Sequence, residues 1–415
     1  MRLFVRRPLL VGAAVLVIGA ASAAAGLLAS HHSRANPKMP KTSSDSLHLT
    51  LLVASTTPAA GGQVEPDGDL VVTFSSPLAD YSPQPSLSPP VAGAWLPDGS
   101  GALEFQSSSG LPPGATETLD IPGGNHGVVA TDGAHLPSAT SLSFTVAPMS
   151  MLRTQELLAT LGYLPLTFTP QSSSPPPTAQ MALDEPGTFS WKWTMPSSFS
   201  SLWTQGQSNV ITSGAVMAFE AQHGLATDGV AGPQVWNALL SAVAQGQTDS
   251  NPDYDWADVS TTVPESVTVW RNGSPLYTTV ANTGIESAPT EVGTWPVYAR
   301  YTSTTMSGTN PDGTHYDDPG VPWVSYFHGG DALHGFVRSS YGYPQSLGCV
   351  EMPPADAAVV YPLTPLGTLV TIEPEGTVNA TTSSATTTST SPPTSTSTTT
   401  TTTSTTIPST TSTTE

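Results

Sequence analysis

The sequence predicts a multidomain chain: an N-terminal β-sandwich, a helical module, a mostly-β C-terminal domain and a disordered tail. Three patterns predict this order. Short β-prone runs separated by Pro, Gly, Ser and Asp fill residues 48–148, and helical periodicity dominates residues 150–245. Alternating strands around an Asn-Gly turn then open a domain at residues 263–375. Residues 376–415 are nearly all Thr, Ser and Pro, a composition that cannot bury a core.

Charge is unevenly distributed along the chain. Six of the 11 Lys and Arg residues precede residue 42, whereas none of the 31 Asp and Glu residues does. The body of the protein is therefore strongly acidic. Binding to nucleic acid through phosphates needs clustered Lys and Arg, so the composition excludes that class of function.

Residues 1–30 carry the pattern of an export signal. Arg2, Arg6 and Arg7 precede an uncharged run from Pro8 to Ser30 that ends in small residues. The run is also long enough to cross a bilayer once as an uncleaved anchor, and both alternatives stay open. We therefore expect a protein exported to the cell wall or extracellular space, with residues 31–47 as a polar linker.

Five β-prone runs predict strands of the N-terminal sandwich: Leu49–Val53, Leu70–Phe74, Ala102–Phe105, Thr116–Ile121 and Leu142–Val146. The phrases Pro58-Ala59-Ala60-Gly61-Gly62 and Ser75-Ser76-Pro77-Leu78 resemble those of bacterial Ig-like domains in wall proteins. We expect this domain to be a spacer, because its histidines lie in Gly-rich turns without other residues suited to chemistry.

Three helices are predicted in residues 150–245. Met151–Leu161 places leucines on one face and ends at Gly162, a second helix covers Ser213–His223, and a third passes through Trp236. The string A-F-E-A-Q-H-G-L-A-T-D-G-V-A-G-P-Q-V-W-N-A-L-L at residues 218–240 closely resembles the type 1 peptidoglycan-binding domain. That resemblance implies binding to peptidoglycan, with a non-binding helical spacer as the alternative.

An insert at residues 169–209 separates the first of these helices from the second. It contains Trp191, Trp193 and Trp203, whose rings can stack on sugars or cover the core, and we expect the core role. Residues 246–262 are predicted to be a linker.

The C-terminal domain opens with a predicted hairpin, Ser266–Arg271 and Pro275–Val280 around Asn272-Gly273. A polar stretch between Tyr301 and Pro322 is predicted to be a loop, either a lid over a ligand or flexible filler. Val324–Phe327 is predicted to be a buried strand.

Cys349 is the one cysteine among 415 residues, so it cannot form an internal disulfide. Such a cysteine is either a small buried hydrophobe or a reactive thiol. A thiol with a pKa of about 8.5 is mostly protonated at neutral pH and needs a base or a cation beside it. His334, brought back by the intervening loop, can supply that base.

The residues around this cysteine resemble a known family. His334-Gly335, then Ser346-Leu347-Gly348-Cys349-Val350-Glu351-Met352, then Asp356-Ala357 and Gly367–Ile372, are similar to the YkuD-type L,D-transpeptidase catalytic domain. The resemblance implies that Cys349 is the acylated nucleophile and His334 its general base. It also implies that the Gly335 carbonyl orients the imidazole and that the N–H groups of Gly348 and Cys349 form the oxyanion hole.

Two residues depart from the family pattern: Leu347 replaces a usual histidine, and Glu351 replaces a common arginine or asparagine. Both leave the thiol–imidazole pair intact, so we expect them to change efficiency or stem-peptide preference rather than reaction class. Arg338 is the candidate for holding the donor carboxylate, with a solvated arginine as the alternative. The other candidates for contact with the stem peptide are Tyr343, Ser346 and Tyr316.

The resemblance implies a monomeric enzyme that forms 3→3 cross-links between peptidoglycan stem peptides without cofactor or metal. Three alternatives stay open. The first is a wall-binding protein without catalysis, and the second is a cysteine carboxypeptidase or endopeptidase of the wall. The third is a zinc site built from His315, His328, His334 and Cys349, although their spacing matches no common zinc motif.

Overall fold

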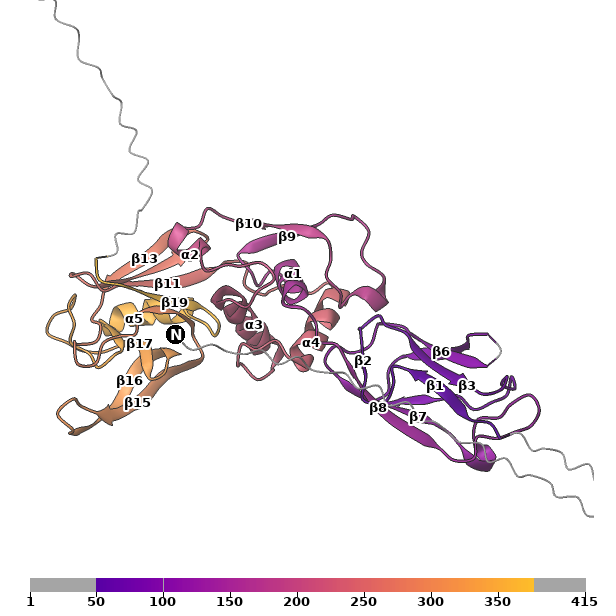
Figure 1. The fold of residues 1–415 in the computed structure, drawn as a ribbon. Coiled ribbons are helices and arrows are strands. Elements are labelled where there is room, and N and C mark those ends of the chain that lie inside the picture. The colour runs from indigo at the N-terminus through magenta and orange to yellow at the C-terminus, as the bar shows by residue number, and fades with distance from the viewer. Residues whose placement is uncertain (1–49, 100, 377–415) are drawn as a thin grey trace, which may run out of the picture. The chain divides into compact units, whose positions relative to one another are not determined.

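The computed structural model describes residues 50–99 and 101–376 (Figure 1). The predicted export signal or anchor, the linker at residues 31–47 and the tail beyond residue 376 lie outside these ranges. Within the described residues, no helix is both long and apolar enough to cross a membrane.

The N-terminal domain consists of two four-stranded sheets around one core, which confirms the predicted β-sandwich. Phe74 and Phe105 from one sheet and Phe144 from the other are buried in this core. The first sheet has the order β1 (Val53–Thr57), β3 (Leu70–Phe74), β6 (Ala102–Ser107), β5 (Gly93–Pro97). The second has the order β2 (Gln63–Val64), β8 (Thr140–Val146), β7 (Thr116–Ile121), β4 (Ser86–Ser88), with the short helix η1 (Gly124–His126) between β7 and β8.

The strand predicted at Leu49–Val53 is misplaced, because β1 begins at Val53. Leu51 is fully buried, so the apolar run does reach the core. The apolar pattern of the sequence therefore indicated which residues are buried. The residues that form hydrogen bonds to β3 are the mostly polar ones that follow, Val53–Thr57.

The helical module contains α1 (Met151–Leu161), α3 (Val210–His223) and α4 (Pro233–Ala244). The first helix has the predicted bounds, and Gly162 ends it in the left-handed conformation with φ 101°. The second begins three residues before the predicted Ser213, because the side chain of Asn209 accepts a hydrogen bond from the N–H of Thr212 and caps it.

The insert in this module is folded. It contains the antiparallel pair β9 (Leu166–Pro170) and β10 (Gly187–Trp191), and the short helices η2 (Thr178–Gln180) and α2 (Ser197–Ser200). Trp191 and Trp203 pack against the hydrophobic core of the module. These two rings therefore have the predicted core role.

The C-terminal domain is mostly β, as predicted. Its five-stranded sheet has the order β13 (Ser274–Val280), β12 (Ser266–Arg271), β11 (Asp255–Ser260), β19 (Leu369–Glu373), β14 (Gly293–Pro296). A four-stranded sheet has the order β15 (Ala299–Thr309), β16 (His315–His328), β17 (Asp331–Gly335), β18 (Val350–Met352). Both sheets contribute to one core, as do the helices α5 (Pro354–Val360) and η3 (Tyr361–Leu363) that precede β19. The hairpin of β12 and β13 turns at Asn272 and Gly273, both with positive φ, as its sequence predicts.

Two predictions for this domain are wrong. The linker predicted for residues 246–262 contains β11, a buried strand in the middle of the five-stranded sheet. Its Asp255 made the segment look like a loop, but that carboxylate is paired with Arg271 at 2.7 Å. The polar loop predicted between Tyr301 and Pro322 is a hairpin of β15 and β16, whose Ser, Thr and Asp residues lack the apolar alternation of a half-buried strand.

The C-terminus of α1 offers a test of the fold. Replacing Gly162 by Ala should lower the free energy of unfolding of the module by about 1 to 2 kcal/mol, because φ 101° is costly for a residue with a Cβ. An added Cβ would meet Asp249 at an ordinary 3.5 Å, so crowding does not contribute. Gly162→Asn should lose less, since Asn tolerates this conformation better. Equal losses for both variants, measured by chemical denaturation, would contradict this account.

Candidate active site

The site is built on the parallel pairing of β17 with β18. In this pairing His334 lies opposite Glu351, and Cys349 immediately precedes β18. The ladder therefore brings the histidine-bearing strand to the segment that follows the cysteine, as the sequence motif predicts.

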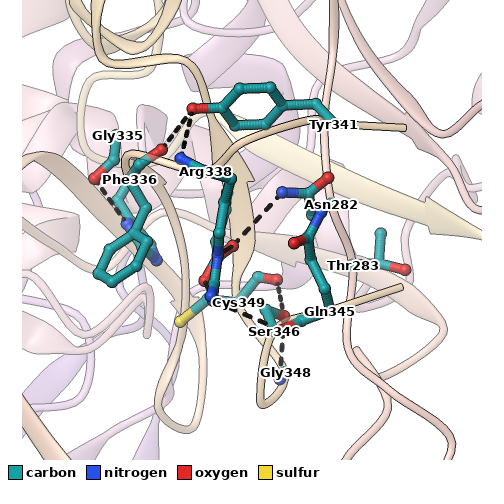
Figure 2. Close-up of polar contacts among 12 residues, drawn as sticks. Asn282, Thr283, Gly335, Phe336, Arg338, Tyr341, Gln345, Ser346, Gly348 and Cys349 are labelled. Carbon is teal, nitrogen blue, oxygen red and sulfur yellow. Dashed lines mark hydrogen bonds and ion pairs between the residues drawn. The ribbon is translucent and has the colours of Figure 1, made fainter. Parts of the chain in front are cut away.

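The turn before β18 is held by the hydroxyl of Ser346 (Figure 2). Its Oγ donates to the carbonyl of Cys349 at 2.5 Å and accepts from the N–H of Gly348 at 3.3 Å. Gly348 has φ 113°, and a Cβ there would lie 2.4 Å from Oδ1 of Asp331. Only glycine meets both conditions, so the residue before the cysteine is fixed by backbone geometry and by close packing.

The loop between the histidine and the cysteine rests on a buried polar scaffold. Oδ1 of Asn282 accepts from the N–H of Gly342, and the carbonyl of Thr283 accepts from the N–H groups of Gln345 and Ser346. Thr283 is held in turn by the buried carboxylate of Glu265, through two hydrogen bonds of 2.6 Å. Sequence reasoning assigned these residues no function, although the phrase Asn282-Thr283-Gly284 was part of the family resemblance.

The imidazole of His334 is 2 % exposed, and its Nδ1 lies 3.1 Å from the carbonyl oxygen of Gly335. A carbonyl oxygen only accepts, so Nδ1 carries the proton and Nε2 of the neutral ring keeps its lone pair. Burial lowers the pKa of His334, against smaller opposing effects that include this hydrogen bond. The ring is therefore a neutral base at physiological pH, with Nε2 as its accepting atom.

The thiol of Cys349 packs against the apolar residues Val321, Val324 and Ala332, and the residue is partly exposed. Burial raises the pKa of Cys349 to about 12, and the carboxylates of Asp331 and Glu351 add to the rise. The N–H of Ala332 has the opposite effect, because it donates a hydrogen bond to the sulfur. The resting site therefore holds a protonated thiol and a neutral imidazole.

Cys349 and His334 line the same cavity of about 360 Å³. The hairpin of β15 and β16 forms one wall of it, through Met306, Tyr316 and Asp318. Leu347, one of the two departures from the family motif, contributes apolar surface. The volume of the cavity lies within the range typical of ligand-binding pockets in proteins.

Arg338 and Glu351 form a two-point ion pair in the wall of this cavity. Nε and Nη2 of the guanidinium donate to the two carboxylate oxygens at 2.8 and 2.7 Å. The guanidinium carbon also lies 4.6 Å from the centre of the Phe336 ring. The hydroxyl of Tyr341 bridges the N–H of Arg338 and the carbonyl of Phe336, which fixes the backbone there (Figure 2).

The structure brings together most, but not all, of the residues that the sequence proposed for substrate contact. Tyr316, Arg338 and Ser346 line the cavity, although the Ser346 hydroxyl is already engaged within the turn. Tyr343 does not line it. Its side chain is 40 % exposed and its hydroxyl bonds to Ser340, because the scaffolded loop turns this residue outward.

The proposed zinc ligands do not gather. His315 is exposed at the start of β16, and the ring of His328 lies 4.4 Å from that of Trp295. Across residues 50–99 and 101–376, no three His, Cys, Asp or Glu side chains are placed to hold a metal ion.

Asp331 is a feature of the site that sequence reasoning missed. Its carboxyl packs against Gly348, next to the cysteine. Burial raises the pKa of Asp331 to about 6, against a hydrogen bond from the N–H of Glu291 and the nearby His328. No motif signals this residue, because its place beside the thiol follows from the pairing of β17 with β18.

Two family models match parts of this chain. Residues 255–372 match the family model described as the L,D-transpeptidase catalytic domain (YkuD), and residues 200–239 match the putative peptidoglycan binding domain. The match begins at β11, which supports the corrected start of the domain. No curated protein matches the chain.

Solved structures of L,D-transpeptidases are similar to this chain at low identity. LD transpeptidase LdtMt1 in complex with imipenem is 15 % identical over 77 % of this chain and 98 % of that chain, with a TM-score of 0.27. An L,D-transpeptidase from Mycobacterium smegmatis is 14 % identical over 78 % and 100 %, with a TM-score of 0.27. The catalytic domain of the E. faecium L,D-transpeptidase is 24 % identical over 28 % and 95 %, with a TM-score of 0.27.

The electrostatics of the thiol predict the pH dependence of its alkylation. With a pKa of about 12, the thiolate fraction of Cys349 should rise about tenfold per pH unit from pH 6 to pH 10, and the iodoacetamide rate should rise with it. Asp331→Asn removes a nearby carboxylate and should shift this profile to lower pH. Rates can be followed by intact mass. A rate that is already constant below pH 7 would instead indicate a preformed thiolate–imidazolium pair.

Proposed function

We propose that this chain, which carries an L,D-transpeptidase catalytic domain at residues 255–372, forms 3→3 cross-links between peptidoglycan stem peptides through a thioester on Cys349. The observation that carries the proposal is that the two groups this chemistry needs line one cavity. A neutral imidazole with its lone pair on Nε2 and a protonated thiol line the same cavity.

The first half-reaction acylates the enzyme. The Cys349 sulfur attacks the carbonyl carbon of the third residue of a stem tetrapeptide, and the thiol proton passes to Nε2 of His334. The resulting imidazolium then protonates the nitrogen of the scissile amide, the C–N bond breaks, and the terminal D-alanine leaves. Because the thiol is protonated at rest, proton transfer accompanies attack, and the Nδ1–H bond to the Gly335 carbonyl keeps the ring in the required tautomer.

The negative charge that develops on the carbonyl oxygen requires N–H donors. The N–H of Cys349 makes no hydrogen bond within residues 50–99 and 101–376, so it is available for this role. The N–H of Gly348 makes only the 3.3 Å bond to Ser346, which it can exchange for the stronger bond to an oxyanion.

The second half-reaction resolves the thioester. A side-chain amine of a neighbouring stem attacks the thioester carbonyl and gives up a proton through His334, and the C–S bond breaks with return of the thiol. Water in place of the amine would make the protein a carboxypeptidase. Leu347 and Met306 give the cavity apolar surface, which disfavours ordered water near the sulfur.

The remaining domains place this chemistry at the wall. The match of residues 200–239 to a putative peptidoglycan-binding domain supports anchoring on the polymer, and the sandwich acts as a spacer. The basic and apolar residues 1–30 direct the protein out of the cytoplasm, as a cleaved signal or as a membrane anchor. We propose that the enzyme works as a monomer and needs no cofactor or metal.

A test of this function uses acylation and cross-linking together. Wild-type protein should gain one covalent adduct with a carbapenem-type β-lactam and should raise the 3→3 dimers in digests of treated sacculi. Cys349→Ala should abolish both. His334→Gln should slow acylation by about 10² to 10⁴, the range typical for loss of a general base.

His315→Ala is the matched control, because this histidine belongs to the same domain but does not line the cavity. It should acylate like wild type. Sacculus binding without any adduct would leave a non-catalytic wall protein, and monomers shortened to tripeptides without new dimers would indicate a carboxypeptidase.

A further inference from the structure

The cavity that holds the thiol is lined by a single Lys or Arg side chain, that of Arg338. The other titratable groups in its lining besides Cys349 and Tyr316 are His334, which is neutral, and the acids Asp318 and Glu351. A substrate carboxylate that enters this cavity therefore has one cationic partner.

Arg338 is held in one orientation. Its Nε and Nη2 are bound to Glu351, and Nη2 also approaches the carbonyl of Gln345 at 3.4 Å. The guanidinium packs on the Phe336 ring. Within the described ranges Nη1 makes no hydrogen bond, so this edge of the guanidinium can still donate two N–H groups to a ligand.

Glu351 is well placed to impose this orientation. It is 4 % exposed and lies on β18 opposite His334, so its backbone is fixed by the same ladder that positions the base. Nδ2 of Asn282 donates to its carboxylate at 3.4 Å, and the backbones of the two residues are hydrogen-bonded in both directions. A buried carboxylate held in this way fixes the charge that pairs with it.

We propose that Glu351 is a positioning residue that holds Arg338 so that the Nη1 edge binds the terminal carboxylate of the donor stem peptide. The pair then makes the enzyme selective for donors with a free C-terminal carboxylate. This inference rests on the proposed transpeptidase function and deepens it, because it names the feature of the donor that is recognised. It also gives Glu351, a departure from the family motif, a function.

The charges of Arg338 and Glu351 are compatible with selectivity for a donor that ends in a carboxylate. Glu351 neutralises Arg338 as a whole, yet a guanidinium has five donors in a fixed fork and can bridge two carboxylates. A charge-assisted hydrogen bond of this kind corresponds to roughly a ten- to hundredfold change in binding.

The test compares two donors, a stem tetrapeptide with a free C-terminal carboxylate and the same peptide with a C-terminal carboxamide. Release of D-alanine or of its amide gives kcat and KM for each. Wild type should prefer the free acid. Arg338→Ala should lose roughly ten- to hundredfold in kcat/KM on the acid, through KM, with little change on the amide. Arg338→Lys, which keeps the charge without the fork, should recover part of the preference.

Glu351→Gln should reduce the preference for the acid while Arg338 is still present, since the guanidinium is no longer held. Asp255→Asn is the matched control, because Asp255 forms the same two-point pair with Arg271, at 2.8 and 2.7 Å, away from this cavity. It can lower thermal stability but should leave the acid-to-amide ratio unchanged.

Two results overturn the inference while leaving the function intact. One is a wild-type enzyme that forms the β-lactam adduct but turns over acid and amide equally. The other is an Arg338→Ala variant that loses activity on both donors by the same factor, which would mean that the pair only clamps the loop. Absence of both adduct and turnover in wild type would instead reject the proposed function, and the inference with it.

Discussion

The parallel pairing of β17 with β18 decides where every reactive group of the site lies. Its register is set by burial. Leu333 and Val350 face each other in the core of the domain, so the next pair, His334 and Glu351, must face the opposite side, which is the cavity. A slip by one residue would turn the imidazole into the core and a leucine into the cavity. The hydrophobic core of the domain thus fixes the side on which the His334 imidazole lies, and the turn that precedes β18 brings Cys349 to the same cavity.

His334 and Arg338 differ in charge, although both are basic side chains. Burial keeps His334 neutral, and the hydrogen bond to the Gly335 carbonyl leaves the lone pair of the ring on Nε2. Arg338 stays charged and is bound by Glu351, so it does not stabilise a thiolate. The carboxylate of Asp331 further raises the pKa of Cys349 and so disfavours the thiolate. The resting thiol is therefore protonated, and a protonated thiol resists oxidation better than a thiolate does.

Sequence reasoning located the fold where local signals are strong. Gly162 and Gly273 have the positive φ angles that their positions predicted, because such turns depend on a few adjacent residues. It failed where the tertiary structure overrides a polar pattern. The strand β11 carries Asp255, whose pairing with Arg271 makes it tolerable inside a sheet, and the part of the β15–β16 hairpin between Tyr301 and Pro322 is mostly polar. His334 and Cys349 were singled out because their motif is local, and both line one cavity. The contacts of Arg338 and of Asp331 were not found, because each depends on backbone segments that meet only in the fold.

The same distinction explains how Glu351 fits a site whose family pattern places a cation or an amide there. An acid at that position, taken alone, adds a repulsive charge beside an anionic substrate. In the folded chain Glu351 is paired with Arg338, thirteen residues earlier. The cation of the site therefore lies on the loop rather than on the strand. The guanidinium thus lies on the loop that contributes to the cavity wall, whereas the strand contributes the carboxylate that holds it. Replacing Glu351 is therefore expected to change the position of the Arg338 guanidinium. Under the proposed function, the first effect would be on which donor peptides bind.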